Sequence, residues 1–478
     1  MKPTWMPTND PSSRHRNSTA QNIGDFRRLT GDQGDRMPKA LIWGESLVGS
    51  GHARIQSELA RHMQAHGWEV VFVTSSKAHA DNFDFGDAEQ IYQPPLQLKS
   101  PDSDPYNMAN LITPNGLSLL ADEAYRDLRR EKLLALYHTH KPDVVITEMW
   151  PYARANFDFE LIPLAQLITT EERNGKPPRL YSIARDIMFP PRLSSPDSPN
   201  LNNDRHAVAA EFFKPHSILV RGDRTVIPLE VSTGAFPEAA RGRIDYIGYF
   251  ASSSPPCDPP QDEGQREVLV SSGGGVTRDS LILFKKSIEA RKYSILHDRI
   301  WRIIVPHGCP ESIFAEIAHT AHAEDPSGRI VVERNRRDFL TLLANAALLI
   351  CHAGNTVIEA VTSQVAALVV PRGLSKNNRE QQVRAQAFFD KGLIELATLA
   401  EIEDPHVLAH KVECAVKALR SSCPILVDGA ARMARRITTD YHQDCAEKII
   451  PFSGASLHGI MTIPATDALC AAPPSSGT

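Results

Sequence analysis

Features typical of membrane, secreted and nucleic-acid-binding proteins are missing from this sequence. No apolar run approaches the roughly 20 residues that a membrane-spanning helix needs, and residues 1–36 contain no apolar segment typical of a secretory signal. The 7 cysteines are odd in number and scattered, without a C-x-x-C pair, which favours a reducing compartment over a disulfide framework. A net charge of -5 argues against bulk attraction to nucleic acid. We therefore expect a cytoplasmic protein.

Short runs rich in Val, Ile and Leu alternate with helical patterns along the chain. The runs are nearly continuous, as in parallel strands that helices cover on both faces. This alternation predicts an α/β fold with two doubly wound, Rossmann-like domains facing a cleft. The predicted strands are 39–44, 70–75, 143–148, 180–185 and 217–222 in the first domain, and 268–273, 301–306, 329–334, 347–352 and 366–371 in the second.

Changes in composition set the expected domain boundaries. The segment between the domains is rich in Pro and Ser, which is typical of a linker, and both ends are polar and poor in aliphatic residues, so we expect disorder there. Met37, directly before the first strand, is an alternative start. The expected parts are a disordered tail 1–36, a first domain 37–248, a linker 249–266, a second domain 267–423, a C-terminal helix 424–452 and a disordered tail 453–478.

A glycine-rich turn follows the first predicted strand. The stretch "GESLVGSGHARIQ" places Gly49, Gly51 and His52 just before an amphipathic helix. Glycines there let backbone N–H groups approach an anion, and the histidine can act as a base or as a hydrogen-bond donor. A tight turn whose histidine only caps the helix explains the pattern equally well, because the full G-x-G-x-x-G motif is absent.

A similar turn opens the second domain. In "VLVSSGGGVTRDSL", Gly273, Gly274 and Gly275 separate a strand from a helix, and Thr277 and Arg278 follow. Backbone N–H groups of such a loop can bind a phosphate, to which the hydroxyl and the guanidinium would add. A flexible turn is the alternative.

The stretch "CHAGNTVIEA" follows another strand and is the most informative. His352, Gly354, Asn355 and Thr356 lie at the turn, and Glu359 lies on the same helix face as Thr356. A carboxylate in that place can accept hydrogen bonds from both hydroxyls of a ribose, while the turn donates to a diphosphate.

The helix after strand 366–371 begins with polar side chains. Glu380 and Gln381 lie in its first turn, where carboxylate and amide groups can bind sugar hydroxyls. In a core each of them would need a polar partner, so we expect them to face the cleft.

Two groups of residues could suggest a metal site. Asp102 and Asp104 form the only D-x-D, but no apolar strand leads into it, which favours a loop or a cap. Another group could converge beyond strand ends, but it lacks a zinc-ligand spacing, and free cysteines are usually buried as small hydrophobes. That group is His307, Cys309, Cys351 and His352. We predict no metal.

The order of these motifs resembles the MurG-like nucleotide-sugar glycosyltransferases, the family 28 group of the GT-B fold. The resemblance is carried by "HAGNTVIEA", "ALVVPRG", "REQQVRAQ" and "KGLIEL", with "SSGGG" before them and "GSGH" near the start. It covers residues 38 to about 440. The stretches "TEMWPYARANFDFELIPL" and "YSIARDIMFPP" are more similar to predicted bacterial glycosyltransferases of unassigned acceptor.

The resemblance implies a role for each domain. The second would bind a nucleotide-sugar donor, with Glu359 on the ribose, Thr356 and residues 273–275 on the diphosphate, Asn335 and Arg336 near the base, and Glu380 and Gln381 on the sugar. The first would hold a small-molecule, glycan or lipid acceptor, with His52 near the reacting atoms. The helix from about 424 would pack back onto the first domain. The donor is a substrate, and no cofactor is implied.

The sequence departs from the MurG pattern at three places. Gly275 replaces a serine, Glu380 replaces the first of two glutamines, and "YIGYFASS" lacks the usual arginine. The remaining candidates to neutralise a diphosphate are Arg278, Arg336 and Arg372. We expect the nucleotide of the donor to contain uridine.

A glycosyltransferase needs a base for the acceptor and preorganised hydrogen-bond donors for the leaving diphosphate. Helix N-termini can supply the donors, so we expect metal-independent transfer. The candidate base is His52, followed by Glu148 and Asp186, with Arg154, Glu160 and Arg185 on the acceptor side. For Arg154 and Glu160, an ordinary ion-paired face is equally consistent with the pattern.

Two alternatives to a glycosyltransferase stay open. A nucleotide-sugar hydrolase or epimerase would share the donor loops, and a non-catalytic subunit would bind the nucleotide sugar without turnover. Peripheral association with a membrane also stays open if the acceptor is a lipid.

Overall fold

The computed structural model describes residues 36–47, 51–100, 103, 105–172, 177–188, 200–251, 266–274, 276–334, 336, 338–373, 379–418 and 425–446. Contacts divide the chain into one unit, Met1–Arg436, which holds both sheets, and a second, Ile437–Thr478, of which the described part is the end of helix α15 (Gly429–Ala446). Several predictions lie outside the described residues: both tails, most of the linker, the D-x-D carboxylates, Gly49, Gly275 and Asn335.

Seven parallel strands form the first sheet, in the order β3-β2-β1-β6-β7-β8-β9. Counted along the chain without the antiparallel pair β4 and β5, this is the order of a doubly wound Rossmann sheet. The strands are β1 (Lys39–Trp43), β2 (Glu69–Thr74), β3 (Glu89–Tyr92), β6 (Val144–Glu148), β7 (Arg179–Arg185), β8 (Ile218–Arg221) and β9 (Ile244–Tyr246); β4 is Gln97–Leu98 and β5 is Leu111–Ile112.

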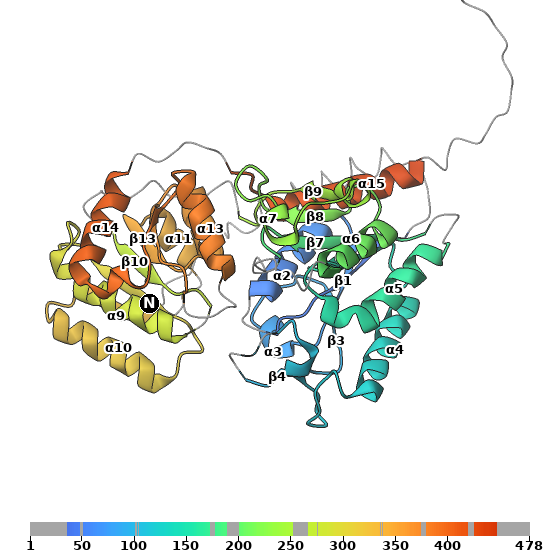
Figure 1. Ribbon diagram of the computed structural model, residues 1–478, viewed down its shortest axis with the longest axis horizontal. Helices are drawn as coiled ribbons and strands as arrows, with labels where there is room; N and C mark the ends of the chain where they lie inside the picture. The colour runs from blue at the N-terminus through green and yellow to red at the C-terminus, as the bar shows by residue number, and fades with distance from the viewer. Residues whose placement is uncertain are drawn as a thin grey trace, which may run out of the picture. The chain divides into compact units, whose positions relative to one another are not determined.

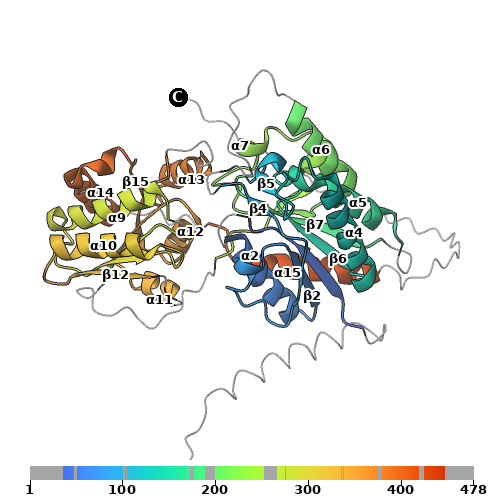
Figure 2. The same ribbon diagram turned by 90° about the horizontal axis from the view of Figure 1, so that it is seen from below.

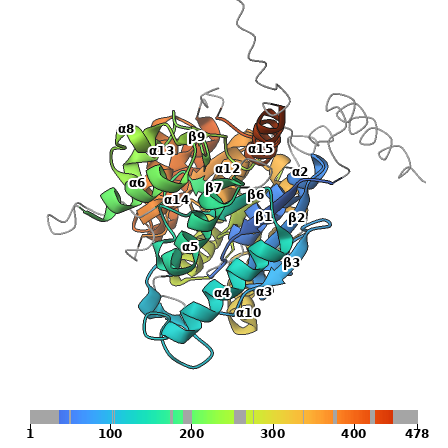
Figure 3. The ribbon, with the colours of Figure 1, turned by 90° about the vertical axis from the view of Figure 1, so that its right-hand side faces the viewer.

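Helices cover the first sheet because its strands are apolar on both faces. Buried side chains of α4, α5, α6 and α8 pack with one set of strand residues, including Leu41, Trp43 and Val145, in a single core. Figure 3 shows α4 and α5 over this face, and Figure 1 shows α6 beside β7 and β8. The helices are α2 (Gly51–Ala65), α3 (Lys77–Ala80), α4 (Glu123–His140), α5 (Asp158–Thr170), α6 (Asn200–Phe212), α7 (Glu230–Thr233) and α8 (Glu238–Arg241), with 3-10 turns at Met108–Asn110 and Ala155–Phe157.

Six parallel strands form the second sheet, in the order β12-β11-β10-β13-β14-β15. One core packs α9, α10 and α14 against one face, and a second packs α11, α12 and α13 against the other (Figure 2). The strands are β10 (Val268–Ser271), β11 (Trp301–Val305), β12 (Ile330–Arg334), β13 (Leu348–Cys351), β14 (Ala366–Val369) and β15 (Glu395–Leu396). The helices are α9 (Arg278–Ala290), α10 (Glu311–Glu324), α11 (Phe339–Ala344), α12 (Asn355–Thr362), α13 (Arg379–Asp390) and α14 (Pro405–Lys417), with 3-10 turns at Arg291–Tyr293 and Glu401–Glu403.

After α14 the chain returns to the end of the first sheet. The N–H of Tyr249 donates to the Leu426 carbonyl at 2.8 Å, and the N–H of Gly429 donates to the Tyr249 carbonyl at 2.9 Å. The backbones approach so closely that a Cβ on Gly429 would lie 2.1 Å from the Gly248 carbonyl oxygen. Gly248 also has a φ of +92°, which favours glycine. The domain boundaries given above stay predictions.

The α/β fold with two doubly wound parallel sheets is confirmed. Each predicted strand is present, with ends within two residues of those expected. The strands that the sequence did not reveal are β3, β9 and β15 at sheet edges, and the β4–β5 pair. They are short and contain polar residues, such as "EQIY" and "IDY", so they lack the continuous apolar signal of the central strands.

Candidate active site

Each sheet reverses its winding beside its first strand, between β1 and β6 and between β10 and β13. Ligands of open α/β sheets bind at this switch point, outside the carboxyl ends of the strands. His52 follows β1 and Glu148 ends β6, and the segments after β10 and β13 hold the glycine loop and His352. The topology therefore places these four predicted features at the two switch points.

At the first switch point His52 and Glu148 form a pair. The Nδ1 of His52, in the first turn of α2, hydrogen-bonds to the Oε1 of Glu148, the last residue of β6. Because a carboxylate accepts, Nδ1 carries the proton and Nε2 is left as an acceptor, the tautomer that a general base needs. Burial lowers the pKa of His52 and Glu148 raises it, and with the added effect of Arg154 and Arg185 the pKa lies below its ordinary value. The pair is thus a neutral imidazole held by a carboxylate.

The environment of Glu148 keeps it ionised. Burial raises the pKa of Glu148, but His52, then Arg154 and Arg185, lower it by more, so that the pKa is about 2. The Nη2 of Arg154 lies 3.5 Å from Glu148 Oε2 and donates to the Glu45 carbonyl at 2.5 Å. Met149, the next residue, has a φ of +64°, a conformation that bulky residues rarely adopt. The geometry favours Glu148 as the residue that orients His52.

A buried ionic cluster lies next to this pair and contains Glu160, one of the predicted acceptor-side residues. Arg129 donates from Nε and Nη2 to Glu160 at 3.0 Å each and from Nη2 to Glu45 at 2.8 Å, and all three side chains are 0% exposed. Both oxygens of Glu160 are occupied, which favours an ion-paired structural role over catalysis. Glu45 in turn accepts from Ser75, so the cluster fixes the chain after β1.

Asp186 follows β7 and binds an arginine of α13. Its oxygens accept hydrogen bonds from Arg384 at 2.9 and 2.7 Å, and both side chains are 3% exposed. Burial raises the pKa of Asp186, but Arg384, together with Arg185 and Arg221, lowers it below its ordinary value. Because both oxygens are occupied, the geometry favours an anchoring role, and the predicted role of Asp186 as a base stays a prediction.

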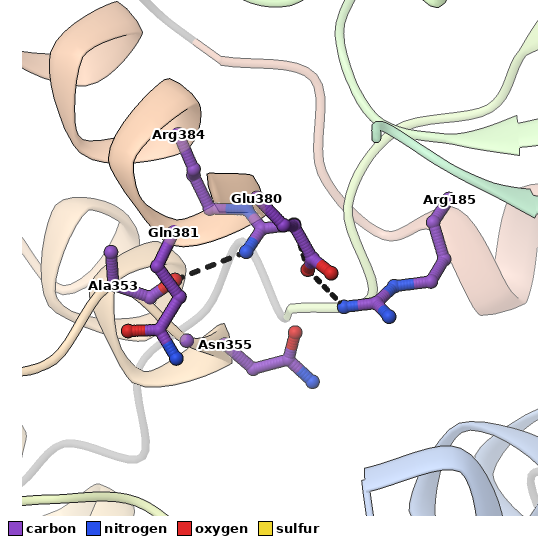
Figure 4. A pocket seen from close by; sticks show the side chains of 7 residues that line it. Arg185, Ala353, Asn355, Glu380, Gln381 and Arg384 are labelled. Carbon is purple, nitrogen blue, oxygen red and sulfur yellow. Dashed lines mark hydrogen bonds and ion pairs between the residues drawn. The ribbon is translucent and has the colours of Figure 1, made fainter. Parts of the chain in front are cut away.

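A cavity of about 180 Å³ lies beside these ion pairs. Figure 4 shows the Arg185 guanidinium reaching Glu380, with the Asn355 side chain below them and Gln381 beside it. Arg384 donates to Glu380 at 2.9 Å and to the Ala353 carbonyl at 3.0 Å. The lining residues are Arg185, Ala353, Gly354, Asn355, Glu380, Gln381 and Arg384. Predicted donor-side and acceptor-side residues therefore share one polar cavity.

In the glycine loop after β10, Gly273 has a φ of +77°, a backbone conformation that favours glycine, and Gly274 is exposed. Thr277 caps α9 in a reciprocal capping box with Ser280, so its hydroxyl serves the helix start. Arg372 donates from Nη2 to the Ser272 carbonyl at 3.1 Å and to the Ser280 hydroxyl at 3.3 Å. Of the predicted candidates, Arg372 is thus the guanidinium held against this loop.

At the start of α12 the predicted ribose carboxylate has a partner. Glu359, 7% exposed, forms an ion pair with Arg54 of α2, whose Nη2 lies 2.5 Å from Glu359 Oε1. Thr356 lies one turn earlier and is half-buried. A ribose bound here would either share Glu359 with Arg54 or displace Arg54 from it. The sequence did not reveal this ion pair.

His352 is neutral and offers an acceptor. Its Nδ1 donates to the Val370 carbonyl at 2.6 Å, and burial, then Arg372, lowers its pKa to about 4. Within the described residues its Nε2 is buried without a partner. This nitrogen can accept a hydrogen bond from a ligand.

Other candidates lie apart from the site or have different partners. Arg336 pairs with Asp338 at 2.6 Å, which weighs against a role at the diphosphate, and Arg278 is exposed. Cys309 and Cys351 belong to separate cores. Among the described residues no group of three or more metal-ligating side chains converges, and none of the described helices has the length and apolarity to span a bilayer.

Sequence reasoning missed Arg54, Tyr106, Arg221 and Arg384. Tyr106 lies under the Arg154 guanidinium, with a ring-centroid distance of 5.6 Å. The signal for Arg221 was available, because an arginine ends the apolar run "SILVRG" as Arg185 ends "LYSIAR". Arg54 and Arg384 are on helix faces, where arginine carries no such signal.

Comparisons with known proteins support the fold and one domain. Residues 333–422 match the family profile described as "Glycosyltransferase family 28 C-terminal domain". No curated protein matches the chain. Among solved structures, the glycosyltransferase of kitacinnamycin is 16% identical, with a TM-score of 0.51, and covers 87% of this chain and 100% of its own. The calicheamicin glycosyltransferase CalG4 is 15% identical, with a TM-score of 0.51 and coverage of 87% and 98%.

A structural neighbour of another described activity has the same fold. It is a candidate UDP-N-acetylglucosamine 2-epimerase from Listeria monocytogenes, 13% identical, with a TM-score of 0.50 and coverage of 86% and 98%. At such identities these likenesses establish the GT-B fold alone. The chain thus has the GT-B fold, and its residues 333–422 match a glycosyltransferase family 28 C-terminal domain.

Proposed function

We propose that the protein transfers a hexose-type sugar from a nucleotide diphosphate sugar, UDP-linked, to an acceptor held at the first sheet. The observation that carries the proposal is the His52–Glu148 pair at one switch point, together with a glycine loop, two helix N-termini and Glu359 at the other. The first arrangement can take a proton from an acceptor hydroxyl. The second can bind a ribose and a diphosphate.

Charge compensation for the leaving diphosphate supports transfer without a metal. Backbone N–H groups at the starts of α9 and α12 point out of the helices, and the helix dipoles favour a negative charge there. Arg372 adds a guanidinium against the glycine loop. We expect activity to persist in a metal chelator.

Nucleotide binding tests the donor assignment. Calorimetry would compare UDP, GDP and dTDP on the wild type, Glu359→Gln and Glu413→Gln; Glu413 is an exposed-face carboxylate of the same domain, paired with Lys417. We expect UDP to bind most tightly of the three nucleotides. Glu359→Gln should weaken the binding free energy of UDP by about 1–3 kcal/mol, because a charged hydrogen-bond acceptor is lost. Glu413→Gln should match the wild type. If no nucleotide binds to folded protein, the proposal fails.

A hydrolase or epimerase is the second candidate, because the Listeria structure shows that proteins described as epimerases also have this fold. Free sugar or an epimerised donor, formed rapidly from a nucleotide sugar without any acceptor, would favour it. A transferase should release sugar slowly until an acceptor is added. A cytoplasmic location is part of the proposal.

A further inference from the structure

Two arginines end neighbouring strands of the first sheet. Arg185 is the last residue of β7 and Arg221 the last of β8, and they are register partners in the parallel pair. Like charges at such neighbouring positions repel each other. Arg221 is 7% exposed, so water screens the repulsion only weakly.

The two guanidinium groups differ in their partners. Arg185 forms an ion pair with Glu380. Within the described part of the chain, Arg221 makes no hydrogen bond or ion pair: its Nε is buried without a partner, and its one contact of note is the Phe250 ring at 5.8 Å. Burial, then Arg185, lowers the pKa of Arg221 to about 10, so it stays charged at neutral pH.

The carboxylates that act on Arg221 have other partners. Glu148 accepts a hydrogen bond from the neutral His52, and Asp186 binds Arg384. Glu58 of α2 also lies within electrostatic range of Arg221, but Arg54 and Arg61 act on it more strongly. A buried charge without a partner destabilises a fold, and binding of an anion would remove this penalty.

We propose that Arg221, with Arg185 beside it, forms an anion subsite on the first sheet for a phosphoryl or carboxylate group of a ligand. A planar guanidinium can bind either group through two parallel hydrogen bonds. The anion belongs either to the donor diphosphate or to an acidic acceptor. Only the naming of these two sources rests on the proposed function.

Binding of inorganic phosphate tests the subsite. Calorimetry would compare the wild type, Arg221→Gln and Arg224→Gln; Arg224 is a nearby, exposed arginine paired with Glu230. We expect Arg221→Gln to lower the affinity for phosphate by roughly tenfold or more. Arg224→Gln should leave this affinity unchanged. Arg221→Lys, which keeps the charge but loses the planar fork, should give an intermediate affinity.

Thermal unfolding without phosphate separates binding from structure. Removal of an unpartnered buried charge should leave the Tm of Arg221→Gln equal to or above that of the wild type, whereas a structural role would lower it. The proposal is overturned if the wild type binds no phosphate, or if Arg221→Gln and Arg221→Lys bind it as well as the wild type does.

Repeating the titration with saturating UDP distinguishes the sources. If UDP displaces the phosphate, the natural anion is the donor diphosphate. If phosphate still binds in the presence of UDP, the natural anion is an acidic group of the acceptor. If UDP does not bind to the wild type, the donor assignment fails, while the comparison of Arg221 variants in phosphate alone still decides the subsite.

Discussion

The two sheets have the same topology but differ in the chemistry at their carboxyl edges. At the first edge, Glu148 holds His52, and Asp186 and Arg185 bind the charged side chains of Arg384 and Glu380 from α13 of the second domain. At its own switch point the second sheet offers mainly backbone groups, in the glycine loop and at the start of α12. Proton transfer needs side chains whose pKa is tuned, whereas phosphate binding needs open N–H groups. One fold can therefore separate these tasks between its two halves.

The largest expected effect of a substitution concerns the base. His52→Asn should lower the turnover of a nucleotide sugar by about 10²–10⁴-fold, the usual contribution of a general base, without weakening nucleotide binding. Nucleotide release and calorimetry measure the two quantities. His62→Asn, on the same helix, is the matched control and should retain activity. Equal turnover in His52→Asn and the wild type would remove His52 from the mechanism.

Asp186→Asn should destabilise the fold by up to about 3–5 kcal/mol, because the buried Arg384 would lose the carboxylate that accepts two of its hydrogen bonds and keep only the more exposed Glu380. Denaturant unfolding measures this change. Asp245→Asn breaks a more exposed ion pair with Arg436 and should stay within about 1 kcal/mol of the wild type. If the two variants were equally stable, Asp186 would not be an anchor and its role as a base would regain support.

A smaller effect is expected at the glycine loop. Gly273→Ala places a Cβ at a φ of +77°, which costs about 1–2 kcal/mol of strain. A Cβ there meets no atom within 4 Å, so any loss of UDP affinity would come from a shift of the loop. Gly308→Ala, another position with open space around the Cβ and without a positive φ, is the control. Unchanged UDP binding in Gly273→Ala would argue against contact between this loop and the diphosphate.

The pH dependence should reveal the His52–Glu148 pair. His52 acts as a base only when neutral, so kcat/KM should fall as the pH drops through its pKa, which burial places below the ordinary 6.5. Glu148 raises that pKa, so Glu148→Gln should move the acid limb to lower pH. A shift to higher pH, or none, would contradict the pairing.

The same carboxylate contributes to stability against acid. Its pKa falls from 4.5 in model compounds to about 2 in the fold, so its contribution is fully present above pH 4.5 and is lost as the pH falls toward 2. Unfolding of the wild type and Glu148→Gln between these pH values measures the difference.

The sequence revealed those features that depend on local pattern. Central strands such as β1 and β13 are continuous apolar runs, and the glycine turns follow them directly. The strand order could be inferred because parallel, right-handed crossovers leave few alternatives. Pairings between distant residues could not be inferred: Arg384 lies 198 positions from Asp186, and nothing local in "REQQVRAQ" indicates that the arginine binds the end of another sheet.

Side-by-side calorimetry of UDP on the wild type, His52→Asn and Glu359→Gln tests the separation of tasks most directly. The account predicts that His52→Asn binds UDP like the wild type while Glu359→Gln binds it about 1–3 kcal/mol more weakly. An equal loss of UDP affinity in both variants would show that proton transfer and donor binding are not separated between the two sheet edges. Undiminished binding in Glu359→Gln would contradict the placement of the donor at the second sheet.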